Sequence, residues 1–283
     1  MNSIDIIKKD PYLKKFISDN KLTDSFVESH LNVFSRVLES RNKCVKCKGL
    51  YTCSQCSVGE RLDLRFDNTL IEEIEYCDYK KDVEKINALA NSFVYSDIPD
   101  RFKGITLDNV TPEDDESKLF VALYDILEGK SDEGLYIVGD MGVGKTFLSI
   151  ALANSLALKN EKVAFVKCSS FINELRRTIA SDSSLYDSYM TNLQKVKYLF
   201  LDDIGSESVS TFSRDDVLFT LLDYRMENHL TTIFTSNLNK NDLIKHYQYD
   251  KKDNSSILRA KRLVERIDIL GKDFVLTGTN KRR

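Results

Sequence analysis

Residues 139–146 read Gly139-Asp140-Met141-Gly142-Val143-Gly144-Lys145-Thr146 and fit the G-x-x-x-x-G-K-[ST] pattern of a phosphate-binding loop. The apolar residues 135–138 before them predict a buried strand, and the apolar residues 147–158 after them predict a helix. In such a loop the glycines let backbone N–H groups approach phosphates, the lysine neutralises the β- and γ-phosphates, and the threonine hydroxyl ligates Mg²⁺. The stretch therefore predicts a nucleotide site. The alternative is a glycine turn that only connects the strand to the helix.

A second apolar stretch ends in acidic residues. Tyr198-Leu199-Phe200-Leu201 predicts a buried strand, and Asp202 and Asp203 follow it directly. Carboxylates at the carboxyl end of such a strand lie beside the phosphate-binding loop. We expect Asp202 to hold Mg²⁺, directly or through water, and Asp203 to be the general base that polarises the attacking water. The alternative is an acidic turn with no catalytic role.

A polar residue follows a third predicted strand. The sequence Thr231-Thr232-Ile233-Phe234-Thr235 is typical of a strand, and Ser236 and Asn237 come next. At the tip of a neighbouring strand, the Asn237 amide can hydrogen-bond the γ-phosphate or the attacking water. Because Ser-Asn also suits an ordinary turn, the catalytic interpretation depends on the order of the three motifs.

Three arginines share one face of a predicted helix near the C-terminus. Arg259, Arg262 and Arg266 are spaced i, i+3 and i+7. Arginine can stabilise the charge that builds on a transferred phosphoryl group, often from a neighbouring subunit. The alternative is a solvated basic face that pairs with acidic residues one turn away.

The order of predicted elements divides the chain. Beyond about residue 115, strands and helices alternate, which indicates a mainly parallel sheet covered on both faces. Residues 1–96 lack this alternation and combine helical patterns with a cysteine cluster. Residues 97–116 contain two of the three prolines and an acidic run, which predicts a linker, although apolar residues within it can pack on the second domain. The predicted organisation is an N-terminal domain over 1–96, a linker over 97–116 and a second domain over 117–283.

Four of the six cysteines fall in the pattern Cys44-x-x-Cys47-x₅-Cys53-x-x-Cys56. Two C-x-x-C pairs this close can supply four thiolates to one tetrahedral zinc ion, and because no position is left for water the metal would be structural. A redox pair or unligated thiols are the alternatives, and Cys77 is close enough in sequence to replace one ligand.

The composition excludes several classes of protein. The 283 residues are 42% apolar, which suits one large or two ordinary domains. The net charge of −3 gives no global basic field, so any DNA contact must come from local patches. No apolar run approaches the ~18 residues of a membrane span, and residues 1–10 lack the apolar stretch of a secretory signal. We therefore expect a cytoplasmic protein that does not enter the membrane, in a compartment where paired cysteines bind metal more often than they form disulfides.

Taken together, the motifs resemble those of the bacterial replicative-helicase loaders, the DnaI/DnaC family, and the resemblance covers most of the chain. The cysteine segment with Gly49-Leu50 is part of it. The strongest shared segments are Leu201-Asp202-Asp203-Ile204-Gly205, Arg214-Asp215-Asp216-Val217-Leu218, Tyr224-Arg225-Met226-Glu227-Asn228 and Phe234-Thr235-Ser236-Asn237.

The resemblance implies an AAA+ ATPase domain behind a small, mainly helical, zinc-binding N-terminal domain that docks on the helicase. It makes residues 139–146 the Walker A motif, Asp202 and Asp203 the Walker B motif and Asn237 sensor 1. Arg266 matches the position of an arginine finger that acts in trans in an oligomer, and sensor 2 would be Arg282 or Arg283. Some members complete the zinc site with a histidine after the third cysteine; none lies there in this chain, and Cys56 is the natural replacement.

The function implied by the resemblance is that of an ATP-dependent loader. It binds the hexameric DnaB-type helicase and delivers it onto single-stranded DNA during primosome assembly, with other primosome proteins and through self-association of its ATPase domains. Phe165, Lys167, Arg176 and Arg177 are candidate DNA contacts. An IstB-type transposition helper ATPase is the main alternative, and the cysteine-bearing N-terminal block argues against it. A non-catalytic ATP-binding adaptor and a redox module are the others.

Overall fold

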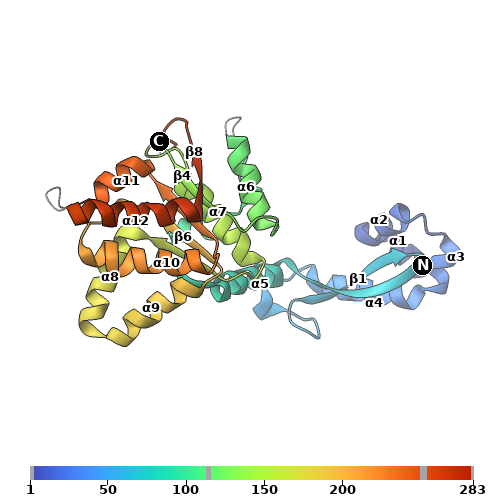
Figure 1. The fold of residues 1–283 in the computed structure, drawn as a ribbon. Helices are drawn as coiled ribbons and strands as arrows, with labels where there is room; N and C mark the ends of the chain where they lie inside the picture. The colour runs from blue at the N-terminus through green and yellow to red at the C-terminus, as the bar shows by residue number, and fades with distance from the viewer. Residues whose placement is uncertain (1–2, 113–115, 249–253, 282–283) are drawn as a thin grey trace. The chain divides into compact units, whose positions relative to one another are not determined.

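The chain divides into two compact units, residues 1–87 and residues 88–283. This computed structural model describes residues 3–112, 116–248 and 254–281 (Figure 1). The division lies upstream of residue 96, where the sequence predicts the boundary. Residues 97–112 consequently belong to the second unit, whereas the sequence predicts a linker there.

Short helices dominate the N-terminal unit, and a two-stranded hairpin packs beside them. Helix α2 (Pro11–Asp19) begins with two stabilising features. The Asp10 carboxylate caps it by accepting a hydrogen bond from the Leu13 N–H at 2.9 Å, and Pro11 at the first helical position has a fixed φ. The elements are α1 (Ser3–Lys9), α2 (Pro11–Asp19), α3 (Asp24–Ser29), α4 (Leu31–Cys44), η1 (Leu50–Thr52), β1 (Glu60–Asp67), β2 (Thr69–Tyr76) and α5 (Asp78–Ser92), which extends into the second unit.

The core of the N-terminal unit is small. It consists of buried aliphatic and aromatic side chains from the helices together with Leu64 from β1, and each contributes about 1.5–3 kcal/mol by its burial. These residues are Ile7, Leu13, Ile17, Val27, Phe34, Val37 and Leu64. The apolar residues that recur at helical spacing in the N-terminal sequence therefore meet in one continuous cluster.

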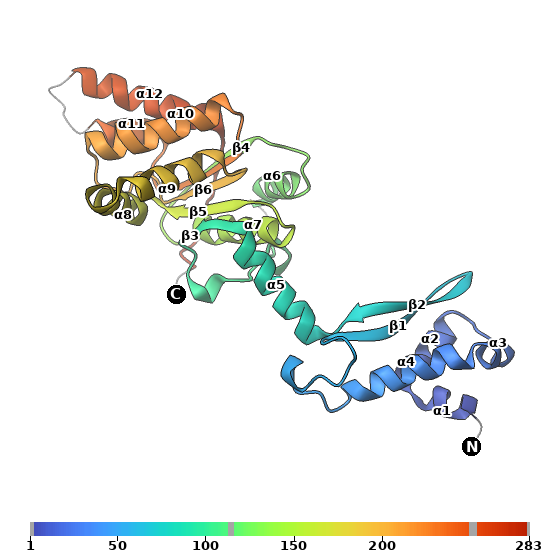
Figure 2. The same ribbon diagram turned by 90° about the horizontal axis from the view of Figure 1, so that it is seen from below.

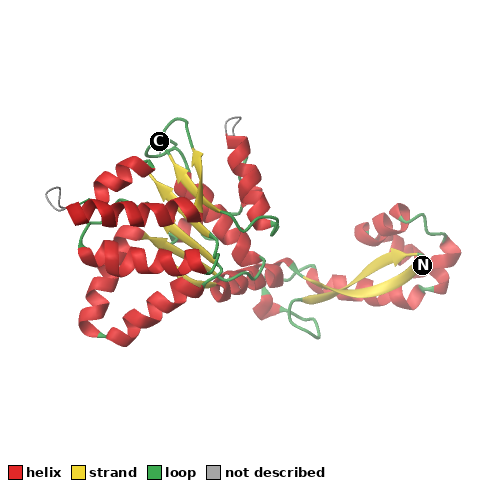
Figure 3. Ribbon diagram, viewed as in Figure 1, coloured by secondary structure: helices red, strands yellow, loops and turns green. Residues whose placement is uncertain are grey.

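The second unit is built on a parallel sheet, whose strands are yellow in Figure 3. It has six strands in the order β3-β5-β6-β7-β4-β8. Strands β6 and β7 are buried at every residue, which explains their continuous apolar character. Since the strands are parallel, their carboxyl ends meet at one edge, where ligands bind in open α/β sheets. The strands are β3 (Phe93–Ser96), β4 (Gly134–Val138), β5 (Val163–Lys167), β6 (Tyr198–Asp202), β7 (Thr232–Ser236) and β8 (Gly271–Val275).

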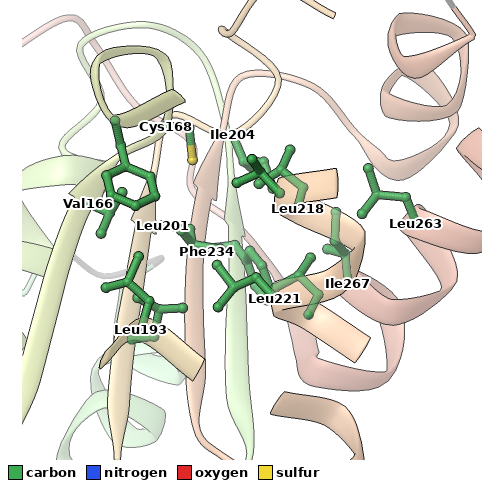
Figure 4. Close-up of a cluster of buried hydrophobic side chains, with 14 of the residues drawn as sticks. Val166, Cys168, Leu193, Leu201, Ile204, Leu218, Leu221, Phe234, Leu263 and Ile267 are labelled. Carbon is green, nitrogen blue, oxygen red and sulfur yellow. The ribbon is translucent and has the colours of Figure 1, made fainter. Parts of the chain in front are cut away.

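Helices cover both faces of this sheet, as the sequence predicts (Figure 2). On one face α6 and α7 pack in one apolar cluster, and on the other α8 to α12 pack in a second cluster with Leu201, Phe234 and Ile267 near its centre (Figure 4). The helices are η2 (Asp100–Phe102), η3 (Leu107–Asn109), α6 (Ser117–Leu127), α7 (Lys145–Leu158), α8 (Cys168–Ser181), α9 (Ser183–Lys195), the π-helix η5 (Phe212–Phe219), α10 (Thr220–Glu227), α11 (Lys240–Tyr247) and α12 (Asn254–Leu270).

The segment that the sequence assigns to a linker is a wall of the second unit. Its first residues continue from β3, the edge strand of the sheet, and the Asp97 carboxylate accepts a hydrogen bond from the Lys167 N–H at 2.8 Å. Leu107 is fully buried, and the Asn154 amide donates to the carbonyls of Phe102 and Ile105, both at 2.9 Å. Prolines and acidic residues give this segment the composition of a linker, and its apolar residues pack on the second unit, which the sequence prediction allowed.

Two residues near the end of β5 lie in the core. Phe165 is 1% exposed and stacks on Phe200 with ring centroids 5.8 Å apart, so its prediction as a DNA contact is wrong. Cys168 is buried, and burial raises the pKa of its thiol. Among the described residues no helix is long and apolar enough to span a membrane.

Candidate nucleotide-binding site

The phosphate-binding loop connects β4 to α7 at the carboxyl edge of the sheet. Gly142 and Gly144 have φ values of 88° and 111°, in the left-handed region that favours glycine. A Cβ at Gly139 would collide with the carbonyl oxygen of Leu276. Because α7 begins at Lys145, directly after the loop, its N-terminal N–H groups and its dipole favour an anion at this position.

Lys145 and Asn237 are brought together across the loop. The Lys145 ammonium donates to the carbonyl oxygens of Gly139 and Asp140 at 2.7 and 2.8 Å and to Asn237 Oδ1 at 2.7 Å. Parallel pairing of β4 with β7 brings Asn237, which follows β7, next to the loop that follows β4 and ends in Lys145. Two residues that lie 92 positions apart in the sequence thus belong to one polar cluster. The order of the motifs predicts that they lie near each other, but not that they are hydrogen-bonded.

Asp202 and Thr146 form the second half of the cluster. Asp202 Oδ1 accepts hydrogen bonds from the hydroxyls of Thr146 at 2.8 Å and Thr235 at 2.7 Å. Burial raises the pKa of the Asp202 carboxyl, and the charge of Asp203 raises it further. A desolvated carboxylate beside a hydroxyl is a pair of hard oxygen ligands, so these residues fit a Mg²⁺ ion, which would neutralise developing phosphate charge when bound.

Asp203 has an unusual backbone conformation for a residue with a side chain. Its φ is 58°, and its N–H donates to Thr235 Oγ1 at 2.8 Å, which fixes this conformation. The carboxylate accepts a hydrogen bond from the Asn237 amide at 3.1 Å. The strained turn therefore directs the carboxylate of Asp203 toward Asn237 at the sheet edge.

Thr235 is a site residue that the sequence did not single out. Its hydroxyl accepts from the Asp203 N–H and donates to Asp202, so it fixes both acidic residues. The available signal was its position next to the end of a predicted strand, two residues before Asn237. Threonine is common in strands, and this signal alone would not separate it from Thr231 or Thr232.

The cluster opens into a cavity of about 1100 Å³. One part of its lining is the phosphate-binding loop with both acidic residues and Asn237; a second part comes from residues 97–111, from Glu116 and from the C-terminal segment. The motifs in the sequence do not predict this second part of the lining, which includes Asp97, Arg101, Phe102, Asn109, Glu116 and Lys281. A cavity lined by a cationic, N–H-rich loop and by an aromatic ring suits a nucleotide.

Arg266 does not belong to the cavity wall of its own chain. Its Nε donates to Asp223 at 2.8 Å and its Nη1 to Glu265 at 3.0 Å, and the side chain is 18% exposed. Arg262, one turn earlier, is exposed, and its guanidinium lies 5.1 Å from the centre of the Phe219 ring. The predicted residues Arg282 and Arg283 lie outside the described residues. A role for Arg266 in catalysis would require a second copy of the chain.

The cysteines of the N-terminal unit are close in sequence but make separate contacts. Cys44 Sγ accepts from the Gln55 amide at 3.2 Å, and Cys53 Sγ accepts from the Gly59 N–H at 3.4 Å, while Cys56 is exposed. In the part of the chain that the structure describes, no three His, Cys, Asp or Glu side chains are gathered to hold a metal ion. The described structure does not gather these cysteines around one point, so the zinc prediction rests on their spacing and on the resemblance.

A family model described as IstB-like ATP binding protein matches residues 117–273, more than half of the chain. The chain belongs to the IstB-like ATP-binding family. The predicted P-loop ATPase domain is therefore confirmed by both the parallel α/β sheet and the family match.

Two individual proteins and one solved structure are also similar to this IstB-like chain. The replicative helicase loader DnaI of Bacillus subtilis is 29% identical over 98% of this chain and 91% of its own length. A crystal structure of DnaI is 30% identical, with a TM-score of 0.57, and the match covers 69% of this chain and 100% of that one. An ATP-binding protein of the insertion sequence IS232 from Bacillus thuringiensis is 27% identical over 51% of this chain and 56% of its own length. The predicted resemblance to the helicase-loader family is thus confirmed, and the match to DnaI includes the N-terminal unit.

Proposed function

We propose that this protein is an ATP-dependent loader that binds a DnaB-type replicative helicase and delivers it onto single-stranded DNA during primosome assembly, in the cytoplasm. The observation that carries the proposal is the extent of the match to DnaI, which spans 98% of the chain and so includes both units. The IS232 protein matches about half of the chain. A shared ATPase domain alone would fit either function, but a shared N-terminal unit favours the loader.

The site supports ATP hydrolysis by positioning and electrostatics. Lys145 and the N-terminus of α7 bind the phosphates, and Thr146 and Asp202 would hold Mg²⁺. Asp203 and Asn237, which hydrogen-bond each other, flank the position for the attacking water, where Asp203 accepts its proton. Lys145 donates a hydrogen bond to Asn237. A phosphate that binds Lys145 therefore also affects the position of Asn237, which orients the attacking water.

Replacing Asp203 by asparagine is expected to lower the rate of ATP hydrolysis about a hundredfold and to leave ATP affinity within a few-fold of the wild type. A general base contributes roughly 10²–10⁴ in rate, and the amide keeps the shape of the side chain but cannot accept the proton. Single-turnover hydrolysis and equilibrium binding of ATP separate the two effects. Asp187→Asn, an exposed substitution on α9, is the control. Hydrolysis at the wild-type rate in the Asp203→Asn protein would assign the base to another residue.

We propose that Arg266 acts on ATP bound to a neighbouring copy of the chain. Arg266→Ala should lower hydrolysis about a thousandfold, the low end for an arginine finger, and should leave ATP binding to the isolated chain unchanged. Mixing Arg266→Ala protein with Lys145→Ala protein tests the action in trans, because only mixed assemblies pair an intact arginine with an intact phosphate-binding loop. Activity that does not recover on mixing, or ATP affinity that falls with the rate, would make Arg266 a structural partner of Asp223.

Zinc in the N-terminal unit is the second part of the proposal. Its support is the spacing of Cys44, Cys47, Cys53 and Cys56, which can supply four thiolates. Purified protein is expected to contain about one zinc ion per chain, and serine at any of the four positions should abolish it, whereas Cys168→Ser should retain it because Cys168 is buried in the second unit. Metal analysis of each variant decides. Zinc lost with Cys77→Ser but kept with Cys56→Ser would move the fourth ligand, and a zinc-free wild-type chain would end the proposal.

Helicase binding is tested on the full-length chain. With ATP and Mg²⁺ present, the protein should co-elute with the host's replicative helicase on a sizing column, and the complex should bind single-stranded DNA through exposed cations such as Lys167 and Arg176. An IstB-type transposition helper is the second candidate, because the matching family model is described as IstB-like ATP binding protein and one relative belongs to an insertion sequence. Binding to duplex DNA and a transposase, without binding to the helicase, would favour that candidate.

A further inference from the structure

The C-terminal segment, residues 276–281, lies against the phosphate-binding loop. Parallel pairing of β8 with β4 brings the end of β8 to the sheet edge that holds the loop. The Leu276 N–H donates to the Val138 carbonyl at 2.7 Å, and the Lys281 N–H donates to the Gly142 carbonyl at 2.9 Å. Backbone hydrogen bonds at both of its ends therefore fix this segment to the loop region.

Two glycines of the loop accommodate this segment. A Cβ at Gly139 would collide with the carbonyl oxygen of Leu276, and a Cβ at Gly142 would collide with the side chain of Asn280. The positive φ of Gly142, 88°, further disfavours any side chain. Close packing of the loop against the C-terminal segment is therefore specified in the sequence of both.

This packing places a second lysine at the nucleotide cavity. Lys281 and Glu116 both line the cavity that Gly142 and Lys145 also line. The Lys281 ammonium lies 3.1 Å from Glu116 Oε1, and the Glu116 side chain is only 4% exposed. A buried carboxylate thus holds a flexible cation in the lining of the cavity that the phosphate-binding loop also lines.

We propose that Lys281 is a further nucleotide-binding residue and that Glu116 competes with the nucleotide phosphates for its ammonium group. The proposal rests on ATP binding in this cavity. A nucleotide brings several negative charges into a site that Lys145 and the helix dipole already make positive, and the four-carbon stem of Lys281 lets its ammonium change partner. Binding would then exchange the Glu116–Lys281 ion pair for a lysine–phosphate contact, so the affinity for ATP includes the cost of breaking that pair.

Competition predicts opposite effects for the two members of the pair. Lys281→Met should weaken ATP binding about tenfold, the equivalent of one charge-assisted hydrogen bond. Glu116→Gln, which keeps the shape of the side chain, should tighten binding several-fold because one carboxylate that competes for the ammonium is removed. The double variant should bind ATP as weakly as Lys281→Met alone. An ion pair that only holds the segment in place would instead give weaker binding in both single variants.

The experiment is isothermal titration of ATP into the full-length chain and its variants. Lys272 and Glu133 supply a matched control, since they form a 3.5 Å ion pair at the start of the neighbouring strands, outside the cavity. Lys272→Met and Glu133→Gln should leave the affinity unchanged, and thermal unfolding should verify that each variant is folded. Equal affinity in all variants, or equal loss in both members of the pair, would overturn the proposal. Failure of the wild-type chain to bind ATP would instead overturn the ATPase function on which it rests.

Discussion

Lys145→Ala is expected to lower ATP affinity at least about a hundredfold and to abolish measurable hydrolysis. The ammonium is almost fully buried and makes three hydrogen bonds, two to loop carbonyls and one to Asn237, which position it for the β- and γ-phosphates. Losing one preorganised donor that stabilises the transition state lowers kcat about 10²–10³-fold. Binding of ATP by titration and hydrolysis by phosphate release measure the two effects separately.

The control for Lys145→Ala lies at the other end of the same helix. Lys159 follows the last residue of α7 and pairs with Glu128 at 2.7 Å on the surface, so Lys159→Ala should retain full affinity and rate. ATP affinity within tenfold of the wild type in the Lys145→Ala protein would show that the phosphates bind elsewhere. The same result would remove the support for the nucleotide site as it is described above.

Arg225→Met is expected to lower the free energy of unfolding by about 3 kcal/mol or more. The Arg225 guanidinium is fully buried and pairs with no carboxylate of the described residues; it donates instead to the carbonyls of Leu193, Val196 and Thr231 and to the Thr232 hydroxyl, at 2.6–2.9 Å. It thereby joins α10 to the loops that precede β6 and β7. Burial lowers the pKa of Arg225 to about 9, so the group still carries its charge at neutral pH.

Methionine fills a similar volume but leaves these buried acceptors without donors, at about 1–3 kcal/mol each before relaxation. Urea denaturation of the full-length chain, followed by a probe in the second unit, gives the change. Arg225→Lys should be intermediate, because one ammonium cannot reach every acceptor, and Lys197→Met, which removes an exposed ion pair with Glu161, should change stability by less than ~1 kcal/mol. An Arg225→Met protein as stable as the wild type would mean that water replaces the guanidinium.

The parts of the site that the sequence predicted are those whose geometry is set by short-range sequence. A strand, a glycine loop and a helix place Lys145 and Thr146 without reference to the rest of the chain. Asp202 and Asn237 could be assigned because parallel strands bring their ends to one edge, which is a property of the fold class. The structure places all of these residues within one network of hydrogen bonds.

The parts that the sequence did not predict depend on the order of strands in the sheet. Residues 97–112 form a cavity wall because β3 pairs at the sheet edge, and Lys281 reaches the cavity because β8 lies next to β4. No local pattern carries that information: the apolar residues of 97–112 indicate that the segment can pack on the second domain, but not that it lines the cavity. The cysteine spacing differs from these cases. It places four thiols close together in the sequence but does not fix where they lie relative to one another, and the described structure does not bring them together.

The central claim is that ATP bound by this chain drives the loading of a replicative helicase, and helicase loading measures it directly. The assay follows strand displacement from a single-stranded DNA circle coated with single-strand-binding protein, with the host's helicase present at a concentration that does not load unaided. The account predicts that the wild-type chain with ATP starts unwinding, and that the Lys145→Ala protein does not. Helicase that remains unloaded with the wild-type chain, although that chain binds and hydrolyses ATP, would contradict it and favour a transposition helper.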